Sequence, residues 1–422
     1  MRFVDNLPTR NESMSQGVNV SMKEGGLKFF KNLKNRFNSL SKRKKIALVA
    51  GGGFFLLILL TTVGYGIYSY LRWNRGSVSP DRYRSTKEIK VDVGEPRDFE
   101  SPINGVLYTK SQGEIFDQRR PLAVMVNNHV DARPVQTGLP EADMIFEAVA
   151  EGGITRFLAV YQANDVEKVG PVRSVRVYYL DWSSEFHAWV AHWGGACTSG
   201  SPANAYDYMA QNGIANLDAM WLGECPTCAY WREPNLPVAW EHNGFTATQK
   251  LYQASAEKWP EWAKKVPFDR WLFKGDLDQA ERPAAGSFTF NFWNLPEYEV
   301  AWTYDPNENV YLRSQGGQPH RDAATGQQLA AKDVVVQFAA ERPAGDGTVH
   351  LLYQTVGSGP AKVFLDGKVI DATWKKTDRQ LRTRYFEAAT GNEIKFNRGQ
   401  VWVEIVPSGN EISYSSSEGV SP

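Results

Sequence analysis

The stretch Ile46–Tyr70, IALVAGGGFFLLILLTTVGYGIYSY, limits the possible folds of this chain more than any other, because 25 consecutive residues carry no charged side chain. An apolar segment of this length is sufficient to cross a bilayer as a helix. A secretory signal peptide would have a shorter apolar region and would normally follow the first few residues of the chain. The sequence therefore predicts a retained transmembrane helix over residues 46–71.

The charges on either side of this helix predict its orientation. The 15 residues Lys31–Lys45 contain seven Lys and Arg, whereas the 15 residues Leu71–Ser85 contain four. Positively charged flanks stay in the cytoplasm. We therefore expect residues 1–45 to form a basic cytoplasmic segment of a single-pass cell-membrane protein, with everything after the helix outside the cytoplasm. Nucleic acid is not expected among its partners.

All three cysteines, Cys197, Cys225 and Cys228, lie beyond the expected helix, which agrees with an exported domain. The CPTC pair can close a small disulfide loop. Zinc is an alternative, with Cys197 and a histidine such as His192 or His242 completing a set of four ligands. Because the spacing lacks a second cysteine pair, we favour the disulfide, with Cys197 as an unpaired thiol. We expect no metal and no cofactor.

The composition changes twice along the exported part. Residues 72–118 are polar and interrupted by prolines, which predicts an extracytoplasmic stalk. In residues 119–282, short apolar runs alternate with helix candidates, which predicts an α/β domain. One such helix is SPANAYDYMAQNG, where we expect Ser201 to cap the start and Gly213 to end the helix.

Short alternating apolar runs replace the helix candidates after a boundary near Glu281–Gly286. They predict a small antiparallel β domain of sandwich or barrel type over residues 283–410, followed by a flexible tail, residues 411–422. The expected fold class is thus an α/β exported domain followed by a small all-β domain, after one N-terminal transmembrane helix. Within the β domain, DPNEN (Asp305–Asn309) resembles the start of a calcium loop, but Val310 replaces the required glycine and indicates an ordinary turn.

The stretch Glu151–Arg176, EGGITRFLAVYQANDVEKVGPVRSVR, places Arg156 before a core-like strand and Arg173 and Arg176 after it. Guanidinium groups bind carboxylates or phosphates through paired hydrogen bonds, so such a group indicates an anion site. If Pro171 begins a helical turn, Arg173 and Arg176 share one face at its positive end. If the segment is extended, they point to opposite sides.

The competing hypothesis is a buried ion-pair network. In that network Asp143, Glu147 and Glu151 would neutralise the arginines, because a charge near a core must be paired. The anion-site hypothesis uses Glu147 and Glu151 differently, to orient the guanidinium groups.

Two histidines and a further arginine lie on loops or strand ends of the same region. His192 precedes a Gly-Gly break, and Arg232 and His242 occur in the segments WRE and EHNG. A histidine near an anion site can shuttle a proton, although most single histidines serve packing. Phosphate-loop, dinucleotide, zinc-protease and Gly-x-Ser-x-Gly signatures are all missing from the sequence, so it supports none of those enzyme classes.

The motifs VMVNNHVDARPVQTGLPEADMIFEAVAEGGITRF, VGPVRSVRVYY and HWGGA resemble the bacterial YerB-like family, a domain of unknown function found in exported lipoproteins. The resemblance covers Arg119–Pro407 and both modules of the family, with WTYDPNENVYLR and GQVWVEIVPSG in the C-terminal one. The positions that match the family pattern are Asn128, Arg133, Glu147, Glu151, Arg156, Arg173, Arg176, His192, Arg232, His242 and Asn243.

Two departures from that family matter. No cysteine precedes Cys197, so a transmembrane helix replaces the lipid anchor. Ala196 and Cys197 stand where the family tends to have serine after Gly-Gly, which argues against a nucleophile there. The order of elements is also similar to the LytR-CpsA-Psr envelope ligases, which hold a polyprenyl pyrophosphate with arginines, but their acidic metal-binding positions are not clearly matched.

These observations predict an envelope protein that binds an anionic ligand, a phosphate-bearing lipid or glycan. Whether it is an enzyme stays open, and no catalytic residue is assigned. The alternatives are a scaffold that docks other envelope proteins and a glycopolymer transferase of the LytR-CpsA-Psr kind. The expected ligand-binding residues are Arg156, Arg173, Arg176, Glu147, Glu151, Asn128, His192, Arg232, His242 and Asn243.

Overall fold

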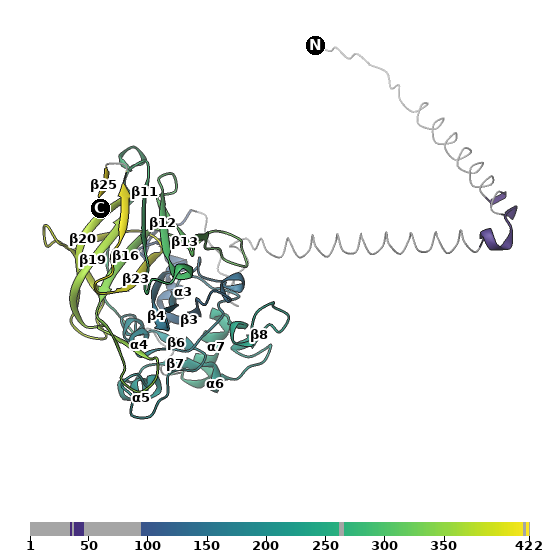
Figure 1. The fold of residues 1–422 in the computed structure, drawn as a ribbon, viewed down its shortest axis with the longest axis horizontal. Helices are drawn as coiled ribbons and strands as arrows, with labels where there is room; N and C mark the ends of the chain where they lie inside the picture. Colours follow the sequence, from purple (N-terminus) through teal and green to yellow (C-terminus); the bar gives the residue numbers. More distant parts are fainter. Residues whose placement is uncertain (1–33, 36–37, 46–93, 261–265, 417–418, 422) are drawn as a thin grey trace, which may run out of the picture. The chain divides into compact units, whose positions relative to one another are not determined.

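Ten strands from both halves of the sequence form one central mixed sheet (Figure 1). The computed structural model describes residues 34–35, 38–45, 94–260, 266–416 and 419–421. In spatial order, the strands of the central sheet are β21 (Arg384–Glu387), β20 (Lys368–Lys376), β19 (Gly357–Leu365), β16 (Asp333–Ala339), β23 (Val401–Pro407), β4 (Met144–Glu151), β5 (Ile154–Tyr161), β3 (Leu122–Asn127), β6 (Trp189–His192) and β7 (Asn216–Asp218).

The middle strands of this sheet are buried along almost their whole length. Strands β3, β4, β5 and β23 consist mainly of buried apolar residues, as expected for strands covered on both faces, and also bury the charged side chains of Glu147, Arg156 and Glu404. Strand β5 is antiparallel to its neighbours β3 and β4, while β3, β6 and β7 run parallel to one another. Strands β3, β4, β6 and β7 therefore all end at the same edge of the sheet.

The second sheet is antiparallel, and its aromatic side chains pack against the central sheet. The rings of Phe288 and Phe364 stack with centroids 3.6 Å apart, and Trp302 meets Trp402 edge-on at 5.3 Å. Its strands are β14 (Gln318–Pro319), β13 (Val310–Gln315), β12 (Val300–Asp305), β11 (Gly286–Phe290), β24 (Ser413–Ser416) and β25 (Gly419–Ser421), with β15 (Ala330–Ala331) beside β13.

Four two-stranded pairs complete the β structure. They are β1 (Arg97–Glu100) with β2 (Leu107–Thr109), β8 (Tyr230–Arg232) with β9 (Gly244–Thr246), β10 (Leu272–Lys274) with β22 (Lys395–Asn397), and β17 (Glu341–Pro343) with β18 (Leu351–Tyr353).

The helices are short. Within the folded unit, which comprises the described residues from 94 onward, Figure 1 shows α5, α6 and α7 gathered opposite the C-terminal strands. The α-helices of the folded unit are α3 (Lys110–Asp117), α4 (Val177–Ser184), α5 (Ala205–Asn212), α6 (Ala219–Leu222) and α7 (Thr248–Lys258). The 3-10 turns are η2 (Arg133–Val135), η3 (Trp240–His242), η4 (Gln279–Glu281) and η5 (Pro296–Tyr298). All eight residues of α4 are buried.

Helix α5 ends at Gly213, as predicted, with this glycine in the left-handed conformation at φ 58°. Its predicted cap is wrong. Asn204 caps the helix, because its side chain accepts hydrogen bonds from the backbone of Tyr206 and Asp207. The Ser201 hydroxyl instead donates to the Asp346 carboxylate.

The fold is rich in strands, as predicted, and the helices α3–α7 all lie before the expected boundary near Glu281–Gly286. The expectation of an α/β domain followed by a separate β domain is not met, since β23 pairs in parallel with β4. Strand β23 is buried on both faces, with apolar side chains except for Glu404, and must therefore be covered on both sides by other strands and side chains. One sheet thus joins the two halves.

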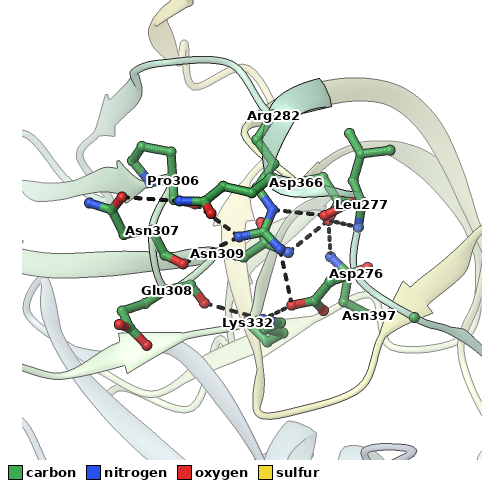
Figure 2. A network of polar contacts seen from close by, with 12 residues as sticks. Asp276, Leu277, Arg282, Pro306, Asn307, Glu308, Asn309, Lys332, Asp366 and Asn397 are labelled. Carbon is green, nitrogen blue, oxygen red and sulfur yellow. Dashed lines mark hydrogen bonds and ion pairs between the residues drawn. The ribbon is translucent and has the colours of Figure 1, made fainter.

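The expected boundary near Glu281–Gly286 is held firmly against the second sheet. Figure 2 shows the Arg282 guanidinium between the chain before it and the β12–β13 turn, donating to the carbonyl oxygens of Leu277 (2.8 Å) and Pro306 (2.9 Å). The Lys332 ammonium contacts Asp276 at 2.6 Å in the same network. In the segment Asp305–Asn309, the residues after Asp305 form the turn between β12 and β13, as predicted.

The expected stalk and tail differ from the structure. Residues 94–118, the described part of the expected stalk, contain β1, β2 and α3, and their apolar side chains Ile103 and Phe116 are buried in the core. Strand β24 falls within residues 411–422 and pairs with β11. The predicted span Ile46–Tyr70 lies outside the described residues, and among the described ones no helix is long and apolar enough to cross a membrane.

Candidate functional site

Most of the predicted site residues lie at or near the edge of the central sheet where β3, β4, β6 and β7 end. Asn127 ends β3, Glu151 ends β4, His192 ends β6 and Asp218 ends β7. Arg156 is at the start of the antiparallel strand β5, opposite Asn127. In open α/β sheets, ligands bind beyond the carboxyl ends of the strands, so this edge is the natural candidate for a site.

The segment that carries Arg173 is extended and is not a helical turn. Val172 bonds to the carbonyl of Gly244, and Arg173 donates its backbone N–H to Met125 at 3.0 Å. Helix α4 starts only after Arg176, which has extended dihedral angles. The condition that would have placed Arg173 and Arg176 on one helical face is therefore not met.

Glu151 holds two of the three arginines. Arg156 lies 2.8 Å from its Oε1, and Arg176 forms an ion pair with its Oε2. Arg156 also donates to the carbonyl of Ser174 at 2.5 Å. Burial raises the pKa of Glu151, but Arg156 and Arg176 together lower that pKa below its ordinary value. Burial lowers the pKa of Arg156 to about 10, helped by Arg176. The ion-pair hypothesis is correct for these two arginines with respect to Glu151.

A β-bulge explains why Glu151 and not Glu147 meets Arg156. Arg156 pairs with Ala148, so its side chain leaves the sheet on the face opposite to that of Glu147. The register shifts between Val149 and Glu151, which turns Glu151 to the face of Arg156. Glu147 therefore does not orient the arginine cluster, contrary to the sequence-based expectation.

Glu147 and Asn128 instead belong to a buried polar network. Glu147 accepts hydrogen bonds from Asn128 (2.9 Å) and Thr155 (2.5 Å) and forms an ion pair with Arg313. Asn128 also contacts the side chain of Gln315 at 3.0 Å. All of these groups except Gln315 have side chains with almost no solvent contact, so they join the sheets and do not bind a ligand from solvent. Asp143, also expected near the arginines, accepts hydrogen bonds from the Asn104 side chain and the Gln162 backbone N–H elsewhere in the core.

Arg173 differs from its two neighbours because it is half-buried and unpaired. Its Nε is buried without a hydrogen-bond acceptor, and Arg173 takes part in none of the ion pairs formed by the described residues. Burial lowers its pKa, while Glu151 and Glu241 act in the opposite direction. Three guanidinium groups thus surround one contacting carboxylate, which leaves an excess of positive charge at this edge.

Arg232 lies between two tryptophan rings on the loops beside this edge. Its guanidinium carbon is 4.1 Å from the centroid of Trp193 and 4.5 Å from that of Trp240. It donates to the side chain of Asn243 at 3.0 Å and pairs with Glu224. Arg232 and Asn243 therefore support the shape of the loops, and Arg232 is already neutralised.

His242 is buried beside strand β3, and its Nδ1 lies 2.8 Å from the side-chain nitrogen of Asn127. Its ring stacks on that of His129 with centroids 4.9 Å apart. Burial, together with the charges of His129 and Arg173, lowers the pKa of His242. This histidine is therefore neutral near pH 7.

His192 is fully buried, and its Nδ1 donates to the carbonyl oxygen of Gly194 at 2.8 Å. Burial lowers the pKa of His192. Its position below the surface does not support the predicted exchange of protons with a ligand.

Sequence reasoning missed three ionisable groups beside this edge: His129, Asp131 and Glu241. Asp131 also lines a groove of about 560 Å³ between the loop after β3 and the segment before η3. The signal was present in NNHVD, where a histidine and an aspartate two positions apart directly follow a strand.

A disulfide joins Cys225 and Cys228, and Cys197 is an exposed free thiol. The alternative zinc set is therefore excluded, because two of its proposed ligands are bonded to each other.

The fold and this edge define a class of mixed-sheet proteins in which the two halves of the chain share a central sheet with an arginine-rich carboxyl edge. The model of the family described as "Protein of unknown function (DUF3048) N-terminal domain" matches residues 109–261, and that of its C-terminal domain matches residues 288–403. The chain belongs to this family.

The chain is similar to a Bacillus subtilis (strain 168) protein named "Putative lipoprotein YerB", with 32% identity over 332 residues, 76% of this chain and 90% of the relative. The crystal structure of YerB from Bacillus subtilis is similar in fold, with a TM-score of 0.62 and 27% identity over 74% of this chain and 99% of the other. The predicted YerB-like resemblance is therefore confirmed.

Proposed function

We propose that this protein is anchored in the cell envelope and binds an anionic ligand outside the cytoplasm, at the arginine cluster formed by Glu151, Arg156, Arg173 and Arg176. The anchoring part of the proposal rests on the uncharged span Ile46–Tyr70, on its basic flank, and on the lipoprotein name of the Bacillus relative. The ligand class is a phosphate-bearing lipid or glycan.

Arg173 is the observation that carries the ligand proposal. A guanidinium group with no carboxylate in contact, next to two others that share one carboxylate, favours an anion over any neutral ligand. Arg156 and Arg176 are already held in place by Glu151, so they add positive charge without side-chain motion. Arg173 supplies the free hydrogen-bond donors.

Inorganic pyrophosphate is a suitable soluble probe for the ligand proposal, titrated calorimetrically into the detergent-solubilised full chain. We expect Arg173→Gln to weaken binding by roughly ten- to a hundredfold, the loss of one charged hydrogen-bonding group. The matched control is Arg342→Gln on the exposed part of β17, which should bind as the wild type does. Equal binding by wild type and Arg173→Gln would contradict the proposal.

The anchoring proposal needs a separate experiment. Membranes from cells that express the full chain are washed with alkaline carbonate, and spheroplasts are treated with protease. We expect the chain to stay in the membrane and its folded unit to be digested from outside. Deletion of residues 46–71 should release the protein from the membrane. A wild-type chain removed by carbonate would contradict the helix anchor.

A further inference from the structure

Three metal-ligating side chains meet beside the arginine cluster without any assigned role. One donor atom from each of His129, Asp131 and His242 lies within 4.8 Å of the other two. The Nδ1 of His129 is 3.6 Å from the Oδ2 of Asp131. Two ligands of a tetrahedral zinc ion, with bonds of about 2.0–2.1 Å, are separated by roughly 3.4 Å. This pair is therefore close to the spacing that an ion requires, and an ion bound to Nδ1 replaces the hydrogen bond that this nitrogen accepts from the Asp131 backbone N–H at 3.2 Å.

Short turns closed by backbone hydrogen bonds fix the positions of the residues that carry these ligands. The carbonyl of His129 accepts from the backbone of Ala132 at 2.8 Å and of Arg133 at 3.2 Å, which closes the turn that presents Asp131. His242 ends η3 and donates its backbone N–H to Ala239 at 2.8 Å. The ligands are thus placed by two loops that are far apart in sequence.

Asn127 connects these two loops. Its side-chain oxygen accepts from the backbone N–H of His129 at 3.0 Å, and its side-chain nitrogen contacts Nδ1 of His242 at 2.8 Å. A single side chain at the end of β3 therefore fixes the backbone of one histidine and the ring of the other. Because the amide nitrogen can only donate, Nδ1 of His242 accepts this hydrogen bond, and an ion that binds through Nδ1 takes the place of the Asn127 donor.

We propose that His129, Asp131 and His242 bind one first-row divalent transition ion of the zinc type. Two imidazoles and one carboxylate match the ligands this ion prefers, and three protein ligands leave a position open for water or substrate. Asp131 is 70% exposed and His129 30% exposed, and Asp131 lines the groove of about 560 Å³, so the open position is accessible. The charges that face the site are Asp131, Glu241 and Arg173. This site stands independently of the anion proposal.

The direct test is titration of the full chain with Co²⁺ and Zn²⁺, after purification in detergent through a tag without histidine and removal of metal with a chelator. We expect one equivalent of Co²⁺ to produce ligand-field absorption that Zn²⁺ abolishes. His129→Gln and Asp131→Asn should weaken Zn²⁺ binding, measured against a chromophoric chelator, by at least about tenfold. Both positions are at least partly exposed, so circular dichroism should show unchanged folding.

Two matched controls separate this site from other zinc ligands of the chain. Cys197→Ser removes the exposed free thiol, and His350→Gln removes a histidine paired with Asp346. Both variants should bind Zn²⁺ as the wild type does. The inference is overturned if wild type takes up no stoichiometric ion, if Asp131→Asn and His129→Gln bind as tightly as wild type, or if Cys197→Ser abolishes binding. The metal titration contains no pyrophosphate, so its outcome does not depend on whether the protein binds pyrophosphate.

Discussion

Arg313 on β13 and Glu147 on β4 form a fully buried ion pair, with 2.5 Å between the guanidinium Nη2 and the carboxylate Oε2. The pair connects the second sheet with the central sheet. Glu404 on β23 lies opposite Glu147 on the neighbouring strand β4. Its Oε1 is 3.8 Å from Nε of Arg313. Burial and then the charge of Glu147 raise the pKa of Glu404 well above its ordinary value. Arg313 thus lies beside both buried carboxyl groups.

Replacing Arg313 with Met should destabilise the protein by about 3–5 kcal/mol, because it leaves a buried carboxylate without a cation. Urea unfolding of the detergent-solubilised full chain measures this loss. The control is Lys362→Ala, which breaks the more exposed pair with Asp371 and should cost at most about 1 kcal/mol. If the two variants lose similar stability, the ion pair does not join the sheets as we describe.

The arginines of the cluster should separate into two kinds when stability is measured. Arg176→Gln removes the ion pair between the buried Arg176 side chain and the partly exposed Glu151 and should cost about 1–3 kcal/mol. Arg173→Gln breaks no hydrogen bond or ion pair of its side chain with the described residues and should change stability by less than about 0.5 kcal/mol. Thermal unfolding of the two variants decides the point, and an equal loss would show that Arg173 has a structural partner.

The strands were largely predictable from the sequence because each is a short apolar run bounded by turn residues. Gly213 likewise marks the end of α5 through its backbone freedom. The pairing of β23 with β4 was not predictable, since the two strands are far apart in the chain and no local pattern records which strands become neighbours. The same missing pairing made the two halves look like separate domains.

The site was predictable in its residue types but not in its partners. Arg156, Arg176 and Glu151 do meet, yet Glu147 faces the other side of the sheet because of the strand register and the bulge before Glu151. A sequence pattern does not show where a bulge shifts the register. His129 was missed because the NNHVD signal becomes meaningful only once His242 is folded against it.

His320 should make the protein sensitive to acid. Its ring is buried between Arg313, which lies 2.6 Å from Nδ1, and Gln136, whose Oε1 lies 2.6 Å from Nε2. Arginine can only donate, so Nδ1 accepts and Nε2 carries the single proton of a neutral ring. Burial, Arg313 and Arg133 hold the pKa of His320 well below its ordinary value of 6.5.

The unfolded chain takes up this proton near pH 6.5 and the folded protein does not. The contribution of the neutral His320 ring to the free energy of unfolding is therefore complete above pH 6.5. It decreases as the pH falls below 6.5, by up to about 1.4 kcal/mol per pH unit. Burial raises the pKa of Asp143 to about 6, so Asp143 changes stability with pH in the opposite direction to His320. This contribution cancels when a His320 variant is compared with the wild type. We expect His320→Gln to be less stable than wild type at pH 7.5 and to lose less stability between pH 7.5 and pH 5.5. Urea unfolding at both pH values tests this prediction. An equal loss of stability in wild type and His320→Gln would contradict it, because His320 would then take up its proton as readily in the folded state as in the unfolded chain.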